Sequence, residues 1–248
     1  MKSRPRVPFL VAVASIALAA FAQADVYELR IYETQEGKLD ALEARFRDHT
    51  IGLFEKHGIE SVGYWVPTSE KASKNTLIYI VKHKNREAAK ASWKAFLADP
   101  EWHAARDQSG VGKLAKRPDV TFMEATDYTP VWENRNSDED DIFELRIYKA
   151  AEGKLGKLDA RFRDHTIRLF EKHGIRSLGY WHPVDEPDSN DTLIYIIEHE
   201  NEDAIKGSWR AFGSDPDWKA AAKASGVGKL AAPIESTYMK ATPYSAVK

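Results

Sequence analysis

The sequence predicts an α+β protein in which two copies of one module pack against each other through their β-sheets. Residues 27–128 align without a gap onto residues 143–244, and about 62 of the 102 aligned positions are identical. Within each copy, the hydrophobic pattern switches between the two-residue period of a strand and the wider spacing of a helix. The chain is therefore a tandem duplication of one α+β unit.

The first copy opens with a strand and a helix. Residues 26–33 alternate apolar side chains at odd positions with polar or aromatic ones at even positions, which is typical of a strand. Residues 38–57 place apolar side chains three or four positions apart and predict a helix. Gly58 follows directly and is placed to end that helix.

The remainder of the copy predicts two strands, two helices and a last strand. Residues 61–66 and 76–83 are rich in β-branched and aromatic side chains. Residues 86–98 predict a helix, and the pair Asp99-Pro100 then starts a short one. Residues 121–127 complete the copy as a strand. The order β-α-β-β-α-β is the ferredoxin-like arrangement.

Such a sheet has helices on one face only, so its other face needs a cover. Two fused copies can supply it to each other. We therefore expect two four-stranded antiparallel sheets facing each other, with the helices outside, as a single-chain pseudo-dimeric α+β barrel. The modules are expected at 25–128 and 142–248, joined by a polar linker at 129–141 that ends in four acidic residues.

The first 24 residues are typical of a signal peptide. Three cations precede an apolar run over residues 8–21, and Ala22-Gln23-Ala24 has the small-x-small pattern of a cleavage site. We expect export to the periplasm or the medium, with residues 1–24 removed and no transmembrane segment left.

Composition narrows the function classes further. Removal of residues 1–24 leaves 33 basic and 38 acidic side chains, about −5 net, with no clustered basic face for nucleic acid. The chain has no cysteine, so its cores alone must hold it together. No H-E-x-x-H or cysteine pattern indicates a metal site.

Several short motifs occur once in each copy and in the same order. They are E-L-R-x-Y, G-K-L, R-F-R-D-H-T, H-G-I, G-Y-W-x-P, L-I-Y-I and S-W-x-A-F-x-x-D-P-x-W. With these motifs the chain resembles the NIPSNAP family over nearly all of its length after residue 24. The resemblance implies a dimeric α+β barrel fold whose wider relatives include cofactor-independent monooxygenases, haem-binding and haem-degrading enzymes, and small isomerases. The analogy at this level is one of fold.

Two histidines are the sharpest catalytic candidates. On the predicted helix, His49 shares the apolar stripe with Phe46 and Leu53 and faces the sheet, and His165 is its copy. A histidine facing the sheet can serve as a general base or as a haem or metal ligand. The alternative is a buried histidine bonded to a backbone carbonyl or a hydroxyl.

Arg45 and its copy Arg161 precede these histidines by one turn and can hold an anionic group beside them. The alternative is a surface arginine paired with Asp48.

The even-numbered residues of the first strand are candidates for binding a polar ligand. We expect them to project from the sheet face opposite the helices, into the space between the modules. The alternative is a structural ion-pair cluster in which the two copies meet. The residues are Glu28, Arg30 and Tyr32, with copies Glu144, Arg146 and Tyr148.

A set of aromatic side chains can line a pocket between helix and sheet, or can form the core instead. The residues are Tyr64, Trp65 and Trp93, with copies Tyr180, Trp181 and Trp209. The modules differ at Gly52, Val66 and Glu124, which become Arg168, His182 and Lys240, so two pockets need not be equivalent.

Together these patterns favour a protein that binds, or binds and transforms, a small molecule in a pocket between helix and sheet. One alternative is a non-catalytic scaffold or interaction module. Another, by fold analogy, is a monooxygenase-like or haem-binding enzyme. No cofactor is predicted from the residues, with haem as the alternative. The assembly is expected to be a monomeric pseudo-dimer or a higher homo-oligomer.

Overall fold

The computed structural model describes residues 24–130 and 138–247. Residues 1–23 of the predicted signal peptide and residues 131–137 of the predicted linker lie outside the described residues.

The first module has the predicted order of elements. Its strands are β1 (Val26–Glu33), β2 (Glu60–Pro67), β3 (Thr76–His83) and β4 (Asp119–Ala125). Its helical segments are α1 (Leu39–Arg45), a π-helical turn (Phe46–Thr50), α2 (Ile51–Lys56), a 3-10 turn (Ala72–Lys74), α3 (Arg86–Ala98) and α4 (Pro100–Gln108). Gly58 has a φ of 70° and ends the first helical stretch, and the Asp99 carboxylate caps α4, as the sequence indicates.

The second module repeats this arrangement. Its strands are β5 (Ile142–Lys149), β6 (Ile175–Pro183), β7 (Thr192–His199) and β8 (Glu235–Ala241). Its helical segments are α5 (Leu155–Arg161), a π-helical turn (Phe162–Thr166), α6 (Ile167–Lys172), a 3-10 turn (Asp188–Asn190), α7 (Glu202–Ser214) and α8 (Pro216–Ala224).

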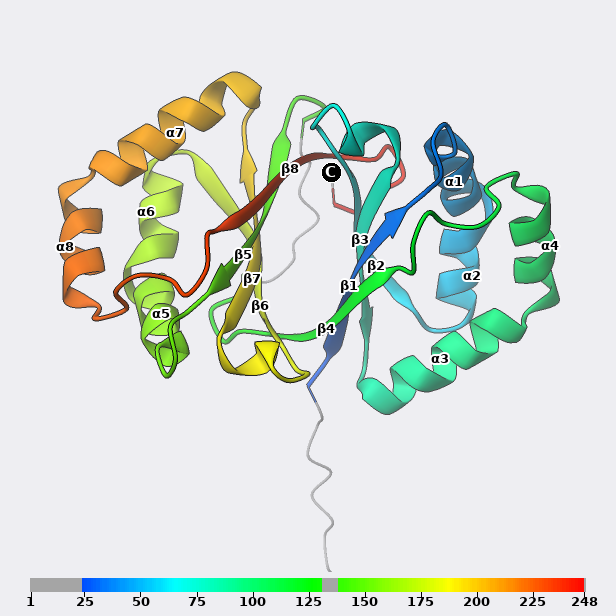
Figure 1. The fold of residues 1–248 in the computed structure, drawn as a ribbon, viewed down its shortest axis with the longest axis horizontal. Helices are drawn as coiled ribbons and strands as arrows, with labels where there is room; N and C mark the ends of the chain where they lie inside the picture. The colour runs from blue at the N-terminus through cyan, green and yellow to red at the C-terminus, as the bar shows by residue number, and fades with distance from the viewer. Residues whose placement is uncertain (1–23, 131–137, 248) are drawn as a thin grey trace, which may run out of the picture.

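The strands of both modules join into one closed barrel with helices outside, on opposite sides (Figure 1). The strand order is β1-β3-β2-β8-β5-β7-β6-β4. Residues 65–67 of β2 pair with 239–241 of β8, and residues 123–125 of β4 pair with 181–183 of β6. The predicted pseudo-dimeric α+β barrel is confirmed. The two facing sheets are in addition hydrogen-bonded to each other at both edges, which the sequence did not predict.

The barrel interior is a closed apolar core shared by the two modules. Tyr27 and Leu29 of β1 point into it, and the Tyr27 ring lies 5.9 Å from that of Trp181 in the other module. The buried members are Tyr27, Leu29, Val62, Trp65, Ile78, Ile80, Met123, Phe143, Leu145, Leu178, Trp181, Ile194, Ile196 and Met239.

The even-numbered side chains of β1 therefore lie on the opposite face from the predicted one. Glu28 and Arg30 contact Trp93 of α3, so they lie beneath the helices of their own module. Their copies in β5 contact Trp209 of α7 in the same way and do not meet them across the barrel. The reason is that a sealed interior offers charged groups neither water nor partners, whereas the helix side offers both.

The segment that follows the last strand of each module binds the other module. The Thr126 amide donates to the Tyr180 carbonyl at 2.9 Å, and the Thr242 amide donates to the Tyr64 carbonyl at 2.9 Å. The Ser245 hydroxyl also accepts from the Tyr64 amide. These reciprocal contacts add to the strand pairing that closes the barrel.

Candidate functional site

A cavity of about 310 Å³ lies in the first module between β1 and the surrounding helices. We call it the Arg45 pocket. Its size is at the lower end of the range for small-molecule sites, and its wall combines aromatic rings with guanidinium groups. The lining residues are Arg30, Tyr32, Arg45, Phe46, Thr50, Phe54, Trp93, Phe96, Leu97, Trp102, Arg106, Gly112 and Leu114.

Arg45 is the unusual member of this wall. Its side chain is buried, with 6% of the residue exposed, and its Nε atom has no hydrogen-bond partner. No carboxylate among the described residues pairs with its guanidinium, which lies 5.1 Å from the ring centre of Trp102. Burial lowers the pKa of Arg45, as expected for a cation that lacks a counter-charge.

The π-helical turn explains why Arg45 faces the pocket while His49 does not. The Ile51 amide bonds the carbonyl of Phe46, five residues back, and the Thr50 hydroxyl donates to the Arg45 carbonyl at 3.1 Å. This inserts one extra residue into the helix, so Thr50 takes the buried position that regular spacing assigns to His49. Such turns are frequent at functional sites.

His49 is exposed, and so is His165, because the second module carries the same turn. The prediction that these histidines lie in the apolar stripe is wrong. Neither lines the Arg45 pocket, so neither fits as an axial haem ligand in it.

Arg30, in contrast to Arg45, has a counter-charge. It forms an ion pair with Glu28, which is fully buried and also accepts a hydrogen bond from Trp93 Nε1, while His83 Nε2 lies 2.9 Å from its carboxylate. Burial alone would raise the pKa of Glu28, but the neighbouring His83 ring and the charge of Arg30 lower it overall. The Arg30 guanidinium stacks 4.3 Å from the Trp93 ring. The cluster thus fixes one wall of the pocket without adding net charge.

The second module repeats both features. Arg161 lies 5.2 Å from the Trp218 ring, and its Nε atom likewise lacks a partner. The buried Glu144 forms an ion pair with Arg146 and accepts from His199 and Trp209, each at 3.0 Å. Tyr148, the copy of Tyr32, accepts a hydrogen bond from Arg146.

Two of the predicted aromatic residues belong to the cores instead of the pocket. Tyr64 is fully buried and stacks on Tyr79 beneath the helices, while Trp65 points into the barrel. Tyr180 and Trp181 take the same places in the second module.

The structure therefore brings Arg30, Tyr32, Arg45 and Trp93 together, as a subset of the predicted site residues. Sequence reasoning missed the other lining residues, and two of these, Trp102 and Arg106, bear most on a charged ligand. Trp102 had a signal, since it ends the repeated D-P-x-W motif, but Arg106 had none, because its counterpart in the repeat is Ala222.

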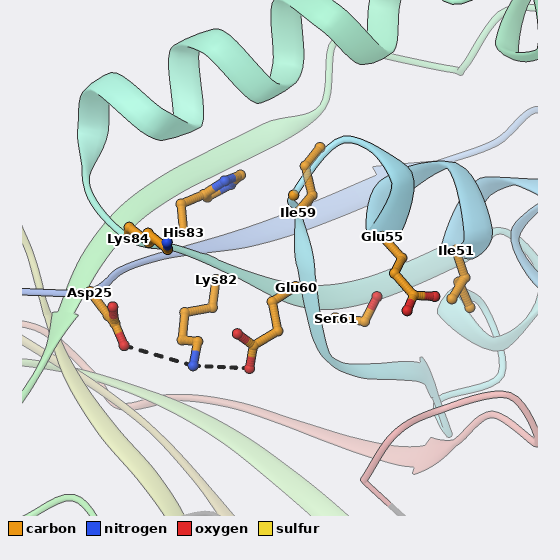
Figure 2. Close-up of a pocket in the computed structure, with 10 residues that line it drawn as sticks. Asp25, Ile51, Glu55, Ile59, Glu60, Ser61, Lys82, His83 and Lys84 are labelled. Carbon is orange, nitrogen blue, oxygen red and sulfur yellow. Dashed lines mark ion pairs between the residues drawn. The ribbon is translucent and has the colours of Figure 1, made fainter.

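A second hollow, of about 570 Å³, opens beside β2 and β3 (Figure 2). Lys82 at its centre pairs with Glu60 at 2.9 Å and with Asp25 at 3.7 Å. The His83 side chain is fully buried and points away from these three groups toward α3. The central cation of this hollow is already paired with two carboxylates, so the hollow offers an anionic ligand less than the Arg45 pocket does.

Within residues 24–130 and 138–247, no cluster of histidines and carboxylates is arranged to hold a metal ion. No helix in the same ranges combines the length and hydropathy needed to cross a bilayer.

Comparison with solved structures shows the fold. A putative monooxygenase from Lactobacillus acidophilus NCFM superimposes with a TM-score of 0.58 at 10% identity, over 88% of this chain and 94% of that one. An anthrone oxidase-like protein gives a TM-score of 0.59 at 14% identity, over 88% and 91%. At such low identity the likeness extends to the barrel architecture alone.

Comparison with sequences is more specific. Protein NipSnap homolog from Dictyostelium discoideum is 27% identical over 134 residues, which are 53% of this chain and 52% of that protein. The chain thus spans about half the length of this relative. The NIPSNAP family model matches residues 27–130 and again residues 143–246. Because these two matches cover both modules and most of the sequence, the chain belongs to the NIPSNAP family, with two family domains in tandem.

Proposed function

We propose that this protein binds a small molecule with an anionic group and an aromatic or apolar body in the Arg45 pocket. The observation that carries the proposal is a buried guanidinium without a carboxylate partner at the wall of an aromatic cavity. A buried charge of this kind is costly unless something pairs with it. An anionic ligand would supply the missing partner.

The geometry assigns the two ends of the ligand to different walls. A carboxylate or phosphoryl group can receive two parallel hydrogen bonds from the planar guanidinium of Arg45. The rings of Trp93, Phe96 and Trp102 give the body of the ligand apolar surface to cover.

The proposal is limited to binding. General acid–base catalysis needs a group that exchanges protons near neutral pH. Among the described lining residues there is no histidine, aspartate or glutamate.

Titration calorimetry with 1-naphthoate and with neutral 1-naphthylmethanol tests the proposal on the full chain. The Arg161→Gln substitution removes the corresponding cation from the second module, so that the titration measures binding to the Arg45 pocket alone.

We expect 1-naphthoate to bind in preference to the alcohol, and Arg45→Gln to weaken its binding by about 10- to 100-fold, the range for a lost charged hydrogen bond. His49→Ala is the matched control, since His49 is exposed on the next turn of the same helical stretch, and it should bind as the parent does. Equal affinity of the parent and Arg45→Gln for 1-naphthoate would overturn the proposal and favour an interaction module.

A further inference from the structure

We infer that the first module selects a ligand with two negative charges at its polar end, that the second module selects one with a single charge, and that Arg106 makes the difference. This inference rests on the proposed function and names the ligand class of each module. It follows from the number of positive charges that each site leaves without a counter-charge.

Three guanidinium groups line the Arg45 pocket. Arg30 is neutralised inside the wall by the buried carboxylate of Glu28. Arg45 has no carboxylate partner among the described residues. Two cations at most are therefore left to act on a ligand, Arg45 at the buried end and Arg106 at the entrance.

Arg106 has an ion pair, but it lies outside the cavity. Its Nε atom donates to Asp107 at 2.8 Å, and the two side chains are 48% and 64% exposed. Asp107 does not line the pocket. An exposed pair between adjacent residues is weak and easily exchanged, so Arg106 remains available to a stronger anion.

Arg45 and Arg106 also act on each other. Burial is the main cause that lowers the pKa of Arg45, and the positive charge of Arg106 lowers it further. The two like charges repel across the cavity, and a ligand with one negative charge compensates only one of them. A ligand with two charges relieves the repulsion as well, which is why it should bind more tightly.

The second module keeps the inner part of this arrangement and loses the outer cation. Arg161 stacks on Trp218, and Glu144 neutralises Arg146, as in the first copy. The residue that corresponds to Arg106 is Ala222 in α8. One guanidinium without a counter-charge among the described residues is left, that of Arg161, and it matches a single negative charge.

Two pairs of probes separate charge from shape. 1-Naphthyl phosphate and 1-naphthyl sulfate share a naphthyl ring and a tetrahedral head. At pH 8 the phosphate carries two charges, because its second pKa is about 6, and the sulfate carries one. Naphthalene-2,3-dicarboxylate against 2-naphthoate makes the same comparison with carboxylates and so distinguishes a phosphoryl from a dicarboxylate ligand.

The measurement is titration calorimetry of the full chain at pH 8. In the Arg161→Gln background, which reads the first module, we expect the doubly charged member of at least one pair to bind about five- to tenfold more tightly. Arg106→Ala should remove this preference. In the Arg45→Gln background, which reads the second module, no preference is expected, and Ala222→Arg should create one. Both substitutions are in helices, at an exposed and a half-buried position, so the variants should fold.

The outcomes separate this inference from the proposed function. If probes bind but charge makes no difference, or if the preference survives Arg106→Ala, the charge selection is overturned and the proposed function stands. If no aromatic anion binds in either background, both are overturned.

Discussion

The guanidinium of Arg45 lies 5.1 Å from the ring centre of Trp102, and 116 residues later that of Arg161 lies 5.2 Å from the ring of Trp218. The pair joins the last residue of α1 to α4 in the first module, and the last residue of α5 to α8 in the second. An aromatic ring attracts a guanidinium without neutralising it. The duplicated chain thus holds a buried cation, Arg45, and a half-buried one, Arg161, each beside an aromatic ring, and leaves both able to pair with an anion.

Arg45→Met should leave the stability of the fold unchanged or raise it, while it removes ligand binding. Methionine has a similar length and carries no charge, and replacing a buried charge by an apolar side chain is often neutral or stabilising by about 1–4 kcal/mol. Urea unfolding measures the free energy of unfolding. Arg47→Met, on the exposed side of the same turn, is the control and should change neither property. A loss of more than about 2 kcal/mol for Arg45→Met would assign Arg45 a structural role.

Glu28→Gln should destabilise the protein by about 3–5 kcal/mol, because it leaves the partly buried Arg30 without its counter-charge. Glu33 is in the same strand as Glu28 and forms a partly exposed ion pair with Lys116. Glu33→Gln removes this pair and should lower the free energy of unfolding by less than about 1 kcal/mol. Similar unfolding free energies for the two variants would contradict the role given to the buried cluster.

The same variant should alter the response to acid. The pKa of Glu28 in the folded protein is lower than its ordinary value of 4.5, so the ionised carboxylate stabilises the fold above pH 4.5. This contribution is lost as the pH falls from 4.5 through the lower pKa of the folded state. Between pH 7 and pH 3, the free energy of unfolding should therefore fall less steeply for Glu28→Gln than for the parent. An equal pH dependence of the two proteins would show that Glu28 does not contribute to acid sensitivity.

Gly63→Ala should destabilise the barrel, because a Cβ atom at Gly63 would lie 2.3 Å from the Trp65 ring, which is fully buried in the interior. We expect a loss of at least about 1–3 kcal/mol from overpacking, and the same for Gly179→Ala beside Trp181. Gly207→Ala in α7 meets no atom within 4 Å and should be neutral or stabilising, since alanine favours a helix. Thermal unfolding of the three variants decides. An unchanged melting temperature for Gly63→Ala would mean that the Trp65 ring can move aside.

A fragment of residues 24–130 should form a homodimer. In the full chain, β2 and β4 pair with strands of the second module, and the apolar face of the sheet is covered by that module. A second copy of the fragment can satisfy the same edges and cover the same face. Light scattering should give the mass of two fragments, close to that of one full chain, which serves as the control. A folded monomer would show that the half-barrel is stable with its apolar face open.

The sequence was sufficient where the signal is local. The repeat, the order of elements, the helix end at Gly58 and the cap at Asp99 depend on neighbours within a few residues, so the pattern of one segment contains them. Family membership followed from the same repeated motifs. Arg45 and Trp93 could be chosen as site residues because residue type and repetition were enough to mark them.

Only the tertiary structure decided which way these side chains face. Alternation along β1 shows that its two faces differ, but both faces are covered in this fold. The segment alone does not determine that Tyr27 points into the barrel and that Glu28 points toward the helices. Regular helical spacing places His49 inside, and a single inserted residue in the π-helical turn gives that place to Thr50. Arg106 enters the pocket through α4, whose position depends on packing between segments far apart in the chain. The orientation of these side chains depends on solvation and packing across the whole module. These energies arise only when segments far apart in the sequence come into contact.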